Sequence, residues 1–200
     1  MSELNQLLVR ELGGDEWQIK GDDVVRIRTG GDCEKLSMYS GFAGYLYCYP
    51  SAFLHVERVM RIVAEITGER YRKCDGTTIF TQLSSLHGQV IPETIEVRSK
   101  VEAARLAPKI ATDFRNVGFA WLERMRSPSN LAEAAMNAEQ YGIMNDPIVR
   151  IVAISLGASK EAASAFLREY DDLDAQGKVL IDISEHRKRI DDFLARLDNS

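Results

Sequence analysis

The chain has 200 residues, of which 45% are hydrophobic and 28% are charged, and its formal net charge is −5. This length and hydrophobic content suffice for a buried core without disulfide cross-links. The negative charge argues against a nucleic-acid backbone or an anionic membrane as the main partner, because both favour a basic protein surface. We therefore expect no nucleic-acid partner.

The apolar stretches of the sequence are short, far below the roughly 20 residues that cross a bilayer. We therefore expect no membrane partner. The beginning, MSELNQLLVRELGG, carries Glu3, Arg10 and Glu11 and lacks the basic and apolar regions of an export signal. The three cysteines show no CxxC spacing, which favours reduced thiols. Together these features predict a cytoplasmic location.

The N-terminal part of the chain combines helical and extended patterns. Leucines at helical spacing predict a helix over residues 2–12, which Gly13 and Gly14 would end. Two β-prone runs at 17–20 and 24–28 flank a Gly-Asp-Asp sequence that favours a turn. We therefore expect a hairpin and a small antiparallel sheet.

The stretch MYSGFAGYLYCYP at residues 38–50 contains four tyrosines and lacks helical periodicity. We expect the longest strand from Leu36 to Tyr49. Its odd-numbered side chains would form a tyrosine face, because successive side chains of a strand alternate between its two sides. The tyrosines of this face are Tyr39, Tyr45, Tyr47 and Tyr49. A structural face is the first interpretation, and a binding surface is the alternative, because tyrosine combines an apolar ring with a polar hydroxyl.

The sequence after Pro50 changes to a helical period. Apolar residues recur on one stripe up to Ile66, Ser51 is a candidate cap and Gly68 a candidate stop. We expect a helix between these two limits, followed by a strand at 77–81.

Basic residues accompany this helix. Arg58 and Arg61 share one helical face, and Arg70, Arg72 and Lys73 follow shortly after the helix. Such a group would suit a small anionic ligand or an acidic partner surface. The alternative, and the more common role of such residues, is ion pairing with neighbouring glutamates.

The sequence beyond Pro92 is mainly helical in pattern. The stretch 93–126 predicts two helices rather than one, because Pro108 is positioned to kink or split a single helix. Further helices are predicted near 130–140, 147–157, after Ser159, and near 184–197. We expect an α+β protein with a sheet-containing subdomain at 1–91 and a helical subdomain at 92–200, packed as one unit.

The predicted pair of helices around Ser159 carries a Leu156-Gly157 step and an Ala162-x-x-x-Phe166 step. These steps resemble one unit of a tetratricopeptide repeat. The sequence holds a single copy, whereas a stable array needs about three. A simple helical hairpin is therefore the first interpretation, and a repeat protein is the alternative.

The common catalytic motifs are missing from the sequence. It contains no P-loop, GxGxxG or GxSxG motif, and His55-x-Glu57 lacks a second ligand motif for a metal ion. A catalytic cysteine would be Cys48 or, better, Cys74, whose basic RYRKCDG setting would lower the thiol pKa. A structural or exposed thiol is the preferred interpretation of both. We therefore expect neither a metal nor a cofactor.

These observations favour a non-catalytic protein that recognises another protein, as an accessory, adaptor or toxin-neutralising protein does. The expected binding residues are Tyr39, Tyr45, Tyr47, Tyr49, Arg58 and Arg61. The alternative is a small-molecule enzyme with a site between the sheet and the helical half. Its candidate residues are Tyr45, Tyr47, His55, His87, Arg58 and Arg61. A homodimer, formed through a bundle face or an edge strand, is compatible with either function.

Overall fold

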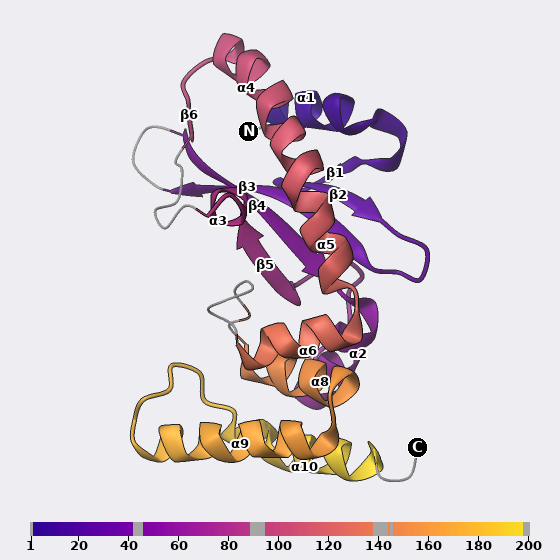
Figure 1. Ribbon diagram of the computed structural model, residues 1–200, viewed down its shortest axis with the longest axis vertical. Coiled ribbons are helices and arrows are strands. Elements are labelled where there is room, and N and C mark those ends of the chain that lie inside the picture. Colours follow the sequence, from indigo (N-terminus) through magenta and orange to yellow (C-terminus); the bar gives the residue numbers. More distant parts are fainter. Residues whose placement is uncertain (1, 42–45, 89–94, 138–143, 145, 198–200) are drawn as a thin grey trace. The chain divides into compact units, whose positions relative to one another are not determined.

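The structure is a computed structural model (Figure 1). It describes residues 2–41, 46–88, 95–137, 144 and 146–197. The fold is α+β, as predicted, with an antiparallel sheet in the N-terminal half and mainly helices in the C-terminal half.

The chain divides into two compact units that each combine two stretches of sequence. Unit 1 contains Met1–His55 and Ile79–Arg124, and unit 2 contains Val56–Thr78 and Met125–Ser200. The boundary that we expected between residues 91 and 92 falls in a segment outside the described residues.

In the sheet of unit 1 the strands β1 to β5 lie side by side in sequence order. A sixth strand, β6, also pairs with β4. All of these pairs are antiparallel. The strands are β1 (Gln18–Lys20), β2 (Asp23–Ile27), β3 (Cys33–Gly41), β4 (Leu46–His55), β5 (Ile79–Gln82) and β6 (Ile95–Val97). The predicted N-terminal hairpin and the strand near 77–81 are thus confirmed.

The single long strand that we predicted from Leu36 to Tyr49 is wrong. β3 and β4 are two antiparallel strands, and their register pairs Tyr39 with Tyr49 and Gly41 with Tyr47. Residues 42–45 between them lie outside the described residues. The break was missed because this stretch lacks the Asn-Gly or Asp-Gly pair that marks a tight hairpin turn.

The predicted start of the following helix is also wrong. Strand pairing continues past Ser51 to the end of β4, and α2 (Glu57–Thr67) begins two residues later. The Ser51 hydroxyl donates to the carbonyl of Tyr49 (3.0 Å), so it caps no helix. The predicted end is confirmed, because Gly68 follows α2 with a left-handed φ of 79°.

The helices of unit 1 are α1 (Ser2–Leu12), α3 (Leu83–Leu86), α4 (Lys100–Asp113) and α5 (Phe119–Met125). α1 packs against β1, β2 and α4. Two helices, α4 and α5, occupy the stretch 93–126 as predicted, but Pro108 lies inside α4 and does not separate them. Burial of Leu106 and Ile110 on the other side of α4 offsets the roughly 3 kcal/mol that an interior proline costs a helix.

A π-helical turn, η2 (Phe114–Gly118), joins α4 to α5. It brings Phe114 and Phe119 together edge to face, with ring centroids 5.1 Å apart. Trp17 stacks on Phe119 at 5.9 Å, and Cζ of Arg26 lies 4.8 Å and 4.7 Å from these two ring centroids. Arg26 Nε also donates to the fully buried carboxylate of Glu34 (2.7 Å). This network anchors the helices to the sheet.

Unit 2 contains α2 and, among its described residues, α6 (Pro128–Met136), α8 (Pro147–Gly157), α9 (Lys160–Ala175) and α10 (Arg187–Arg196). α8 packs against α2, α6 and α9, and α10 packs against α2. The predicted caps are confirmed: Asp146 accepts the Ile148 N–H (2.8 Å) at the start of α8, and Ser159 accepts the Ala162 N–H (3.1 Å) at the start of α9. α8 and α9 therefore form the predicted helical hairpin.

Candidate functional site

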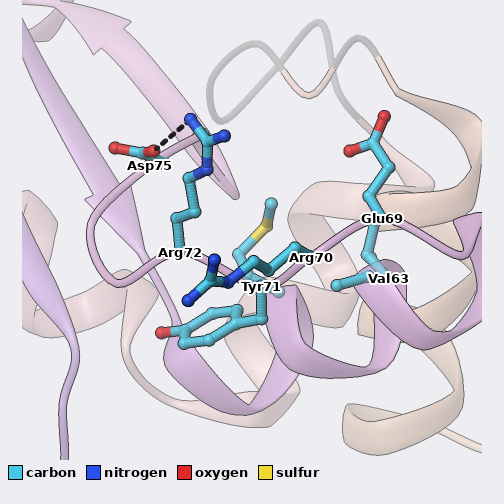
Figure 2. A pocket seen from close by; sticks show the side chains of 9 residues that line it. Val63, Glu69, Arg70, Tyr71, Arg72 and Asp75 are labelled. Carbon is cyan, nitrogen blue, oxygen red and sulfur yellow. Dashed lines mark ion pairs between the residues drawn. The ribbon is translucent and has the colours of Figure 1, made fainter.

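The candidate functional site is a pocket in unit 2, formed by α2 and the segment that follows it (Figure 2). Its volume is about 480 Å³. The residues of α2 that line it are Met60, Val63 and Ala64, and those of the following segment are Glu69, Arg70, Tyr71, Arg72, Asp75 and Gly76. This size lies within the range of small-ligand and side-chain binding pockets.

The segment that lines the pocket is closed at its base. The Val56 N–H donates to Oγ1 of Thr78 (2.8 Å), which joins the two ends of the stretch 56–78. The Cys74 side chain is buried, and Cys74 and Gly76 adopt left-handed φ angles of 61° and 72°. These backbone angles turn the chain back toward α2.

The floor of the pocket is apolar and close to the returning chain. Val63 is only 6% exposed. A Cβ atom added to Gly76 would lie 3.0 Å from Cε of Met60, so the backbone of the segment approaches α2 too closely for a larger residue without movement of that methionine. The floor is therefore shaped by Met60 and by the absence of a side chain at Gly76.

One wall of the pocket is the ring of Tyr71. Cζ of Arg61 lies 4.4 Å from the centroid of this ring. The Nε of Arg61 donates to Oε1 of Glu57 (2.7 Å), one helical turn earlier on α2. Arg61, a predicted binding residue, is therefore outside the pocket lining and instead holds Tyr71 against α2.

The charged rim of the pocket contains two arginines. Nη1 of Arg72 lies 4.0 Å from Oδ2 of Asp75, and the two side chains are 73% and 48% exposed, so this pair contributes little stability. Arg70 is exposed and forms no hydrogen bond or ion pair with any described residue. In Figure 2 the carboxylate of Glu69 points away from both guanidinium groups. The rim thus presents a cation that no described carboxylate neutralises.

Arg58, the other predicted arginine, is exposed on α2 and does not line the pocket. The residues that do line it, Arg70 and Arg72, were recognised in the sequence as part of the basic group but were not chosen as site residues. The signal was present in the RYRKCDG sequence. Only the chain reversal near Gly76, however, places those arginines beside the apolar face of α2.

The predicted tyrosine face belongs to unit 1. The β3–β4 register pairs Tyr39 with Tyr49, and Tyr47 lies two residues before Tyr49 on β4. Tyr49 is half-buried, and Tyr45 lies outside the described residues. A binding role for these tyrosines stays a prediction.

The two histidines named for the alternative enzyme lie at the ends of different elements of unit 1. His55 is fully buried at the end of β4, and His87 is exposed at the end of α3. A cavity of about 20 Å³ in unit 1 is lined in part by Ser84, His87 and Asp113. Within the described ranges these three side chains form no hydrogen bond with one another, and the cavity has room for about one water molecule.

The cysteines correct a further prediction. Cys33 and Cys74 are both disulfide-bonded and buried, so the predicted reduced thiols are wrong for these two residues. Local spacing could not reveal this, because folding and not sequence proximity brings disulfide partners together. The bond removes Cys74 as a candidate nucleophile, and the argument from reduced thiols for a cytoplasmic location no longer applies.

No cluster of three or more His, Cys, Asp or Glu side chains that could hold a metal ion occurs in the described part of the chain. None of the helices described for this chain has the length and apolar character needed to cross a membrane.

Comparisons of the chain with protein-family models, with curated proteins and with solved structures found no match. The function is therefore inferred from the chemistry of the pocket.

Proposed function

We propose that this protein recognises another protein without catalysing a reaction, by binding an acidic segment of that partner in the pocket beside α2. The observation that carries the proposal is the Arg70 guanidinium, which is exposed and in no ion pair with a described residue, next to the apolar floor formed by Met60 and Val63. An acidic side chain with an apolar neighbour would complement both features.

The binding energy would come from two sources. A carboxylate that accepts from Arg70 forms a charge-assisted hydrogen bond, which is stronger than a neutral one. An apolar side chain on the floor gains about 25 cal/mol for each Å² of apolar surface removed from water. A ligand would compete with the ion pair of Arg72 and Asp75 on the same rim, which is weak because it is long and exposed.

Preorganisation of the wall favours the same conclusion. Glu57 and Arg61 hold Tyr71 in place in the free protein, so the ring need not be ordered when a partner binds. A side chain that is already fixed saves about 0.5–1.5 kcal/mol of ordering cost on association.

Fluorescence anisotropy with labelled synthetic peptides tests the proposal. The probe is a short peptide that alternates leucine and glutamate, and the control peptides replace either leucine with serine or glutamate with lysine. We expect the Leu-Glu peptide to bind best, and Arg70→Glu to weaken its binding about tenfold or more, the equivalent of about 1.4 kcal/mol.

The matched control is Arg58→Glu, which makes the same charge change on α2 outside the pocket and should leave most of the affinity intact. Equal losses in the two variants would show that net charge alone drives binding and would contradict the proposal.

A further inference from the structure

The loop between α9 and α10 exposes an unusual group of side chains. Leu180 is fully exposed, and Ile181 and Leu173 are 40% and 37% exposed. Asp174 directly follows Leu173 in the sequence, and Asp182 directly follows Ile181. We call these five residues the acidic tip.

The acidic tip has a fixed backbone at the end of α9. The Gly177 N–H donates to the carbonyl of Asp174 (2.8 Å), and the Lys178 N–H donates to the carbonyl of Leu173 (2.9 Å). Gly177 has a left-handed φ of 65°, and these two bonds form the Schellman arrangement that ends many helices. The chain therefore leaves α9 in a defined direction.

The remainder of the loop is tied down as well. The Tyr170 hydroxyl donates to the carbonyl of Ile181, and Oδ1 of Asp182 accepts the Ser184 N–H (2.8 Å). An apolar side chain as exposed as Leu180 on an ordered loop has no folding role, and its exposure to water is unfavourable. A partner that covers it would gain apolar burial without having to order the loop.

The charge of the acidic tip is negative. Hydrogen bonds from the Ser184 backbone and side chain lower the pKa of Asp182, which keeps its carboxylate ionised. Burial raises the pKa of Tyr170. The negative charge of the nearby Asp174 carboxylate raises this pKa further. Asp174 forms no ion pair with any residue that the structure describes.

We propose that the acidic tip of one copy of this chain docks in the Arg70–Arg72 pocket of a second copy. The inference rests on the proposed function, since it names a second copy as one occupant of that same pocket. The two surfaces are complementary in both charge and polarity. Leu180 would cover the floor at Met60 and Val63, and Asp174 would face Arg70.

The proposed contact joins two copies of the chain through two different surfaces, the acidic tip and the pocket beside α2. A contact between two different surfaces is heterologous. Each copy at the end of such an assembly still has a free tip or a free pocket, so the copies form a ring or an open chain. The small size of the contact predicts weak association that depends on concentration.

Sedimentation velocity with two complementary variants tests the inference. The pocket variant is Arg70→Glu with Arg72→Glu, and the tip variant is Asp174→Lys with Leu180→Lys. Asp182 is kept because its carboxylate holds the Ser184 N–H. We expect the wild type to self-associate, less so at high salt, and each variant alone to be monomeric.

The decisive sample is the equimolar mixture of the two variants. The pocket variant keeps an intact tip and the tip variant keeps an intact pocket, so the mixture should form a one-to-one dimer. Because this dimer requires both variants to be folded, its formation excludes misfolding as the cause of their monomeric state. Arg58→Glu should associate as the wild type does.

Three results would overturn the inference: a wild type that is monomeric up to about 1 mM, variants that associate as the wild type does, or a mixture without dimer. If the acidic peptide still binds in any of these cases, the proposed function stands. Self-association that follows the expected variant pattern, with no peptide binding, would instead contradict the proposed function alone.

Discussion

The guanidinium of Arg61 lies 4.4 Å from the ring centroid of Tyr71 and donates to Glu57 one turn earlier on α2. This relationship joins the helix that supplies the pocket floor to the segment that supplies its charged rim. An exposed cation over an aromatic ring contributes about 0.5–1 kcal/mol, and a pair at positions i and i+4 about 0.3–0.5 kcal/mol. Arg61 is thus a residue that positions the pocket wall.

The first prediction concerns this arginine. Arg61→Gln removes both contacts and should lower the free energy of unfolding by about 1 kcal/mol. Urea denaturation measures the change. Arg58→Gln, on the same helix and exposed, has no such contacts with described residues and should change stability by less than about 0.5 kcal/mol. Indistinguishable midpoints for the two variants would contradict the role assigned to Arg61.

The second prediction separates pocket shape from backbone strain. Gly76 and Gly88 have similar φ angles of 72° and 76°, so alanine at either position should cost about 1–2 kcal/mol of stability. A Cβ at Gly76 would also displace the flexible end of Met60, whereas a Cβ at Gly88 meets no atom within 4 Å. Peptide affinity should therefore fall several-fold in Gly76→Ala and stay unchanged in Gly88→Ala. Equal affinities in the two variants would show that the floor does not contact the peptide.

The third prediction concerns the buried carboxylate of unit 1. Glu34 is fully buried and accepts hydrogen bonds from Arg26 (2.7 Å) and Arg28 (3.0 Å). Glu34→Gln leaves these two cations without their shared carboxylate and should cost about 3–5 kcal/mol. Glu123 pairs with Arg28 at 2.9 Å but is 55% exposed, so Glu123→Gln should cost less than about 1 kcal/mol. Urea midpoints that rank the two variants in the opposite order would refute this account of the network.

The fourth prediction is a count of free thiols. The chain has three cysteines, and two of them, Cys33 and Cys74, are disulfide-bonded. Protein denatured without reductant should therefore react with one equivalent of a thiol reagent, and with three equivalents after reduction. Three reactive thiols before reduction, in protein purified without reductant, would mean that the bond does not form in solution.

Local signals accounted for the parts of the fold that were predicted correctly. Asp146 and Ser159 satisfy backbone N–H groups of their own helices, and Gly68 supplies a left-handed angle, so a few neighbouring residues determine each of these boundaries. Such features can be read from a single sequence, because no distant contact is needed to form them.

The features that were missed depend on distant contacts. The residues from Ser51 to the end of β4 are in a strand because β3 and β5 pair with them, although their own pattern favours a helix. Likewise, Arg70 becomes a candidate site residue only because the chain turns back at Gly76 and closes at Thr78. Neither arrangement has a periodic signature in the sequence.

The most direct test of acidic-segment recognition is a double-mutant cycle between Arg70 and the peptide. The wild type and Arg70→Glu are each titrated with the Leu-Glu and the Leu-Lys peptides, and the four affinities give one coupling energy. We expect a favourable coupling of about 1.5–3 kcal/mol, as for a hydrogen bond to a charged group, with Arg70→Glu preferring the lysine peptide. A coupling energy near zero would show that Arg70 does not interact with the charged residue of the peptide, and it would contradict acidic-segment recognition by this pocket.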